Sequence, residues 1–324
     1  MPDSPRNGTK QVYIRKIDAL GSQIGRLEND AARRAMALML DAQRKINTRI
    51  SALGESDGWR IANARSLQAQ VDDIMAEFRR DYGVAFSSVL GNAYENGIQA
   101  VDEPLGVSGV VLRPARLSRN VIEVLQGFSA DLIQKVSAEV IASVNSIITS
   151  SMLGIESPFA AQRRIAQVLG ASDSLRELTG VSARAEKIFR TEVGRVQSIA
   201  TQARQQEVAQ DVEDIEKVWT ATGDGRTRSG HLTAHGQHVG VDEYFEVAAK
   251  VGQPMEELMY PRDPRGSAGN TIQCRCRSTT WRAGYGAFLP RTTGRVDVEK
   301  ERRAEEAFVI VRRVWPGATW RAAG

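Results

Sequence analysis

Hydrophobic residues in the first part of the chain recur at steps of three and four, the spacing of one face of a helix. They recur in this way from Ile17 to Leu53, within a stretch that begins at about Lys10. This series predicts one long helix, which ends at the glycine-containing stretch 54–58. The same spacing predicts further helices at 60–80, 85–100, 118–150 and 182–210. Such a stripe fits a helix that packs in its own bundle, or a surface that grips a partner, and the first is the more common arrangement.

One shorter helix carries local signals at both ends. In "SPFAAQRRIAQVLG", Ser157 is suited to the N-cap and Pro158 to the first helical position. Gly170 is suited to the position just past the last turn, where a left-handed backbone is common. A helix is therefore predicted between Pro158 and Gly170.

The pattern changes after Asp214. "IEKVWTAT" and "TIQCRCRSTTW" alternate hydrophobic and polar residues, and "HVGVDEYFEV" reads as strands around a turn. We therefore expect a small α+β module over 215–283 and an α+β fold that is mostly α. The predicted division is a helical scaffold or arm at 1–180, the module at 181–284, and a basic C-terminal tail with a short helix at 285–324.

Composition is that of an ordinary soluble protein, at 42% hydrophobic and 25% charged residues. Two cysteines one residue apart make no disulfide framework. The polar start "MPDSPRNGTK" lacks the apolar core of a signal peptide, and no apolar run is long enough to span a bilayer. We therefore expect no membrane partner.

Positive charge is concentrated near the C-terminus. The stretch 262–321 holds 13 Lys or Arg against 6 Asp or Glu, although the whole chain carries only +4. Such a stretch predicts an anionic partner such as nucleic acid. The alternative is a solvated arginine-rich surface.

All thiols and imidazoles of the chain fall within one window of the sequence. His231, Cys274 and Cys276 are candidate zinc ligands, because thiolate and imidazole are the groups that zinc prefers. A C-x-C on a strand would place both thiols on one face. Asp224 and His235 are the candidates for a fourth ligand. The alternative is that both cysteines are small core residues, with His231 hydrogen-bonded nearby.

No catalytic residue is assigned. The chain lacks the fingerprints of zinc proteases, serine hydrolases, P-loop enzymes and dinucleotide-binding enzymes. A DNA-binding metal module, a metal-dependent nuclease or a toxin-like effector remains the alternative function. Arginines around the thiols and the turn could hold phosphate or pair with acidic neighbours, and these candidate nucleic-acid contacts are Arg226, Arg228, Arg275 and Arg277.

A combined motif resembles one known family. "KVWTATGDGRTRSGHLTAHGQHV" is followed by "DEYF", a loop with proline and glycine, and "GNTIQCRC", and "RTE" occurs in the helix before them. Together these are similar to the phage Mu protein F-like minor head proteins. The matching positions are Trp219, Asp224, Arg226, Thr227, His231, Gly236, Asn270, Cys274, Arg275 and Cys276. Some relatives have C-x-x-C where this chain has Arg228 and His231, which removes one thiol from a metal site here.

The resemblance implies a structural role in a virion. It implies a minor head protein at the portal vertex and capsid interior, acting in head morphogenesis and in DNA packaging or delivery. The implied partners are the portal protein, the major capsid or scaffolding protein, and packaged double-stranded DNA. The implied locations are the virion, and the host cytoplasm during assembly. In such a protein Asp224, Arg226, Thr227 and His231 would organise a tight turn rather than catalyse.

Overall fold

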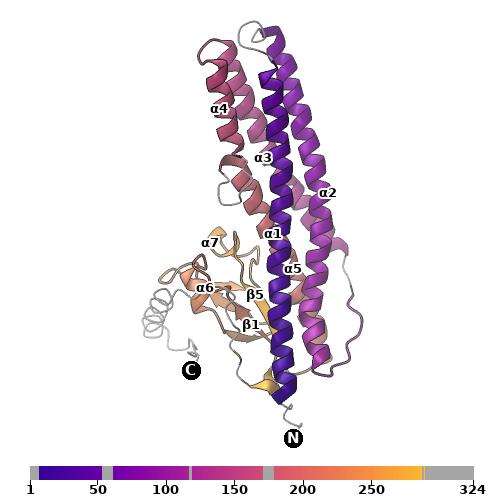
Figure 1. Cartoon of the computed structure of the whole chain (residues 1–324). Coiled ribbons are helices and arrows are strands. Elements are labelled where there is room, and N and C mark those ends of the chain that lie inside the picture. The colour runs from indigo at the N-terminus through magenta and orange to yellow at the C-terminus, as the bar shows by residue number, and fades with distance from the viewer. Residues whose placement is uncertain (1–6, 53–60, 117–118, 171–178, 287, 289–324) are drawn as a thin grey trace. The chain divides into compact units, whose positions relative to one another are not determined.

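The computed structural model describes residues 7–52, 61–116, 119–170, 179–286 and 288 (Figure 1). The chain forms two compact units that each gather distant segments. Unit 1 comprises Met1–Leu27, Gly91–Ser118 and Val193–Gly324, and unit 2 comprises Glu28–Leu90 and Arg119–Glu192. These units group the chain differently from the predicted division at 180 and 284, which stays a prediction.

Helices make up most of the described chain, which confirms the mostly-α, α+β fold class and the long N-terminal helices (Figure 1). They are α1 (Asn7–Ser51), α2 (Ile61–Val107), α3 (Arg119–Met152), α4 (Pro158–Leu169) and α5 (Gly180–Ala209). A helix this long is stabilised mainly by packing of its apolar stripe.

Helix α2 corrects one prediction, because the two helices expected at 60–80 and 85–100 are continuous. Gly83 lies at the expected break, and a single glycine costs a helix only about 1 kcal/mol relative to alanine. The buried rings of Tyr82 and Phe86, one turn apart, stack 5.7 Å between centroids. Both also meet Phe189 of α5 edge-on, at 5.2 and 4.8 Å. This aromatic packing within unit 2 outweighs the low helix propensity of Gly83.

The local signals around α4 are confirmed. The Ser157 side chain accepts a hydrogen bond from the backbone N–H of Ala160 at 3.2 Å, and Pro158 opens the helix. Gly170 ends it with φ of 60°, in the left-handed region. These predictions succeed because they depend only on neighbours in sequence.

A three-stranded antiparallel sheet forms the centre of the module in unit 1. Strand β1 (Ile215–Thr220) lies between β2 (His238–Gly240) and β5 (Arg277–Arg282). Its register pairs Val218 with His238 on one side and with Thr279 on the other. The alternation in "IEKVWT" and "RSTTW" therefore predicted the central strand β1 and its neighbour β5.

The rest of the module consists of short elements. Strands β3 (Phe245–Val247) and β4 (Glu256–Leu258) form a separate two-stranded sheet. Helix α6 (Ser229–Thr233) follows β1, and α7 (Ala268–Thr271) precedes β5. The strands of "HVGVDEYFEV" thus pair with other partners and not with each other.

The core of unit 1 joins the start of α1 to the sheet. Tyr13 is fully buried, packs edge-on against Trp281 at 5.5 Å, and donates a hydrogen bond to the Thr280 carbonyl at 3.1 Å. Phe288 stacks on the Trp281 ring, with 4.1 Å between the ring centroids. The N-terminal helix is therefore part of the core that supports the module.

No helix within the described ranges has both the length and the hydrophobicity needed to cross a membrane. The short helix predicted in the basic C-terminal tail lies outside the described residues.

Candidate functional site

The turn that follows β1 is organised by Asp224. Its carboxylate accepts hydrogen bonds from the backbone N–H of Arg226 and from the hydroxyl of Thr227, both at 3.1 Å. Arg275, on the segment before β5, binds both carboxylate oxygens. This hydrogen-bonded ion pair lowers the pKa of Asp224 well below its usual range. The Asp224 side chain thus connects the turn to the cysteine-bearing segment.

His231, Cys274 and Cys276 meet in a buried cluster. The Nδ1 atom of His231 lies 3.4 Å from the sulfur of Cys276 and 3.5 Å from that of Cys274. The potential ligand atoms of all three residues lie within 4.8 Å of one another. None of the three is more than 2% exposed. The sequence prediction that these residues come together therefore agrees with the structure, whereas metal binding stays a prediction.

The cysteines reach the cluster from irregular backbone, not from a strand. Strand β5 begins only at Arg277, and the chain enters the segment through Gln273, whose φ of 54° is left-handed. Both thiols nevertheless face His231. The hydrogen bond from Cys276 lowers the pKa of Cys274, while burial raises the pKa of Cys276.

The backbone of α6 brings His231 into this position by a close approach. A Cβ atom on Gly230 would lie 2.0 Å from the carbonyl oxygen of Ala248. Only glycine therefore lets this helix pack directly on the chain that follows β3.

The remaining contacts of His231 fix its ring. Its Nε2 atom lies 3.0 Å from the side-chain oxygen of Asn270, and the amide nitrogen of Asn270 donates to the Val247 carbonyl at 3.3 Å. The ring of Trp219 meets the His231 ring edge-on at 5.7 Å. Trp219 is fully buried, and its indole Nε1 has no hydrogen-bond partner within the described chain.

The two candidate fourth ligands lie in other interactions. Asp224 forms its ion pair with Arg275. His235 accepts a hydrogen bond at Nδ1 from the backbone N–H of Ala221, 3.2 Å away. The third histidine, His238, contacts Glu216 at 3.0 Å and the Phe288 carbonyl at 2.8 Å. Over the described ranges, the cluster of potential metal ligands has three members.

The four arginines proposed to contact nucleic acid differ in exposure. The Arg226 side chain is 80% exposed, with Asp224 at 3.7 Å. Arg228 donates to the Ile272 carbonyl at 2.6 Å, and Arg275 is engaged with Asp224. The Arg277 guanidinium packs directly over Gly21 of α1. Their role as phosphate contacts stays a prediction, and Arg226 is the most accessible of the four.

Gly236, the remaining motif residue, closes the turn after α6. Its φ of 79° lies in the left-handed region, and its N–H donates to the Trp219 carbonyl at 2.9 Å. A side chain there would be strained.

Sequence reasoning missed two buried cations beside the site. Arg262 is 1% exposed, has φ of 70°, and donates to the Gly194 carbonyl at 3.1 Å. Lys217 is fully buried on β1 and donates to Gln202 at 3.2 Å and to the Met259 carbonyl at 2.7 Å. Burial lowers the pKa of Lys217 to about 8. The period-two pattern that places Ile215, Lys217 and Trp219 on one face could have found Lys217.

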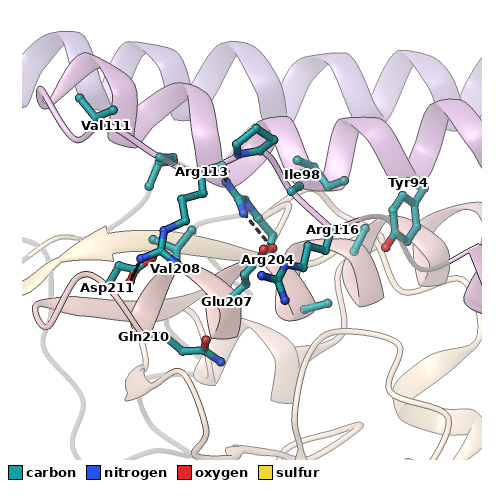
Figure 2. Close-up of a pocket in the computed structure, with 15 residues that line it drawn as sticks. Tyr94, Ile98, Val111, Arg113, Arg116, Arg204, Glu207, Val208, Gln210 and Asp211 are labelled. Atoms are coloured by element: carbon teal, nitrogen blue, oxygen red, sulfur yellow. Dashed lines mark hydrogen bonds and ion pairs between the residues drawn. The ribbon is translucent and has the colours of Figure 1, made fainter.

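A cavity of about 350 Å³ lies elsewhere in unit 1 (Figure 2). Arg204 lines it, and its guanidinium donates to Asp102 at 2.6 Å, to Glu207 at 2.8 Å and to the Arg113 carbonyl at 2.6 Å. None of the residues predicted from the motif lines this cavity. Its main buried charge is satisfied by the chain itself.

Comparison with known proteins gives a family match over the region that holds the site. Residues 162–279 match the family model described as "Phage Mu protein F like protein", which confirms the resemblance. The matched region includes the turn at Asp224, His231 and both cysteines. The family model therefore covers the whole candidate site.

One curated relative and the solved structures complete the comparison. The chain is 36% identical over 92 residues to the NAD(+)--arginine ADP-ribosyltransferase EFV of Enterococcus faecalis. The aligned region is 28% of this chain and 17% of that protein. The chain thus spans about a sixth of the length of that relative. No solved structure gives a significant match.

Proposed function

We propose, on the premise that the chain carries a phage Mu protein F like domain, that it is a minor head protein of a tailed phage. It acts in head morphogenesis, at the portal vertex and the capsid interior, and in DNA packaging or delivery. The match of residues 162–279 to the family model is the observation that carries the proposal. The motif residues support it because they hold the module together.

The burial of the motif supports an architectural role over catalysis. His231 is 1% exposed and each cysteine 2%, so a polymeric substrate could not reach them without opening the module. Asp224 and Arg275 are bound to each other. The nuclease alternative needs an accessible general base or metal-bound water beside the phosphate. The site geometry therefore favours a structural role, in which the motif residues hold the loops of the module together.

Unit 2 offers a surface for head partners. Leu153, Ile155 and Phe159, at the connection between α3 and α4, are 65%, 74% and 68% exposed. Large apolar side chains grouped on a surface are typical of protein contacts. We assign the portal protein, and the major capsid or scaffolding protein, as the partners of the helical unit.

Purified particles test the main proposal. Mass spectrometry of DNA-filled heads should find the chain at low and constant copy number. Deletion of its gene should reduce the yield of infectious particles, and a plasmid copy should restore it. A deletion strain with normal yield, whose parent particles lack the chain, would overturn the proposal.

Contact with packaged DNA is tested separately. Binding to a double-stranded oligonucleotide should weaken steeply as salt rises, because phosphate contacts release counterions. Arg226→Ala should lower the affinity and reduce the salt slope by about one. Arg33→Ala removes another largely exposed arginine, from α1, and serves as the control. Affinity that is independent of salt would argue against phosphate contacts.

A further inference from the structure

The cluster of His231, Cys274 and Cys276 has the dimensions of a tetrahedral zinc site. Zinc binds sulfur at about 2.3 Å and histidine nitrogen at about 2.0–2.1 Å, so a nitrogen–sulfur edge of the tetrahedron is about 3.5 Å long. The two observed distances from Nδ1 to sulfur are 3.4 and 3.5 Å. An ion would therefore fit with little movement of these atoms.

The hydrogen bonds of Asn270 set the tautomer of His231. The Asn270 amide nitrogen donates to the Val247 carbonyl, which leaves its oxygen to face Nε2 of His231. That oxygen can only accept, so the ring proton lies on Nε2. The Nδ1 lone pair then points at both sulfurs. Metal-binding histidines are oriented in this way by an acceptor on the other nitrogen.

Trp219 supplies an independent observation. Its indole N–H is fully buried and lacks a hydrogen-bond partner within the described chain, which is costly for a buried donor. The indole packs in the same buried cluster as Cys274 and Cys276. A neutral thiol is a weak acceptor, whereas a metal-bound thiolate carries negative charge. Ligation would give this N–H the acceptor that it lacks.

We propose that His231, Cys274 and Cys276 bind one Zn²⁺ ion, with a water molecule or another small ligand in the fourth position. Asp224 and His235 are engaged elsewhere. The ion joins α6 to the segment before β5, which are 43 to 45 positions apart in sequence. Because the unfolded chain lacks this arrangement, binding free energy becomes folding free energy. The inference goes beyond the proposed function and does not depend on it.

The competing arrangement is a metal-free cluster in which a thiol donates a hydrogen bond to His231. Both arrangements bury the same three side chains. They differ in metal content, in the charge of the sulfurs, and in the response of stability to zinc.

Full-length protein from zinc-supplemented cells should contain about one zinc per chain after gel filtration. Chelation should lower the melting temperature by several degrees, and added Zn²⁺ should restore it. Replacement by Co²⁺ should give thiolate-to-cobalt charge-transfer absorption and the intense visible bands of tetrahedral cobalt. Wild-type protein that is folded, free of zinc, and indifferent to both ions would overturn the proposal.

Variants locate the ion. Cys274→Ser and Cys276→Ser should each reduce zinc content several-fold and remove the charge-transfer band. His235→Ala, a neighbouring histidine outside the cluster, should retain both. If the serine variants fail to fold, release of zinc from the wild-type protein by a thiol-modifying mercurial gives the same information. Full zinc content in the folded serine variants, or no release on thiol modification, would place the metal elsewhere and overturn the proposal.

Discussion

Arg275 donates hydrogen bonds to both carboxylate oxygens of Asp224, although 51 positions separate the two residues in sequence. Asp224 orders the turn after β1, and Arg275 lies between the two cysteines. The ion pair therefore holds the turn and the thiol segment at a fixed separation, beside the buried His231. Its partly buried position makes it more sensitive to substitution than a surface pair.

Asp224→Asn should destabilise the protein by about 1.5–3 kcal/mol at pH 7, because a hydrogen-bonded charge pair is lost. The sign of the pH dependence follows from the lowered pKa of Asp224. Stability from this group is fully present above its unfolded pKa of about 4, and is lost as pH falls toward the folded value. The difference between wild type and variant should therefore shrink below pH 4. Urea unfolding at several pH values measures it.

Asp30→Asn is the matched control for that experiment. Asp30 forms an i,i+3 pair with Arg33 in which both side chains are more than 60% exposed. Such pairs contribute about 0–1 kcal/mol, so the variant should follow wild type closely. Equal effects of the two substitutions would contradict the structural role of Asp224.

Two glycines of α2 should respond to alanine with opposite signs. A Cβ atom on Gly97 would lie 2.6 Å from Ala200 of α5, whereas one on Gly91 meets nothing within 4 Å. Gly97→Ala should cost about 1–3 kcal/mol through overpacking. Gly91→Ala should stabilise by up to about 1 kcal/mol through helix propensity. Thermal unfolding compares them, and stabilisation by both would show that α2 and α5 do not approach here.

Arg204 and Arg113 test the charge network around the cavity of Figure 2. The Arg204 side chain is 3% exposed and donates to three acceptors, which a lysine cannot reproduce. Arg204→Lys should cost about 1.5–3 kcal/mol. Arg113→Lys, at a side chain 77% exposed, should cost less than about 1 kcal/mol. A reversed order in chemical denaturation would contradict the network.

The sequence predicted best what depends on near neighbours. The caps at Ser157 and Gly170 and the stripe of α1 follow from local preference and period. The break expected near Gly83 was wrong, because the packing of Tyr82 and Phe86 on Phe189 is invisible in a single helix. Tertiary contact outweighed propensity there.

The candidate site divides in the same way. Residue type alone identified His231 and the two cysteines as candidate metal ligands. Their meeting depends on the left-handed backbone at Gln273, which brings both thiols to one side of the His231 ring. The partnership of Asp224 with Arg275 joins segments that no spacing rule connects. Arg262 was missed because an arginine in a proline-rich loop is normally exposed to solvent. Its burial depends on the close approach of Gly194 to its guanidinium group.

Lys217 should make the stability of the protein rise with pH in a range where most lysines stay protonated. Its folded pKa is about 8, against about 10.4 in the unfolded chain, so the unfolded state binds more protons between these values. Stability should therefore increase by about 2 kcal/mol between pH 7 and pH 9.5 through this group alone. Lys217→Met removes the contribution, so the difference between wild type and variant in urea unfolding should change by that amount. Lys250→Met, which removes an exposed lysine of the same unit, controls for the change in charge. A difference that stays constant with pH would mean that Lys217 is hydrated in the folded protein.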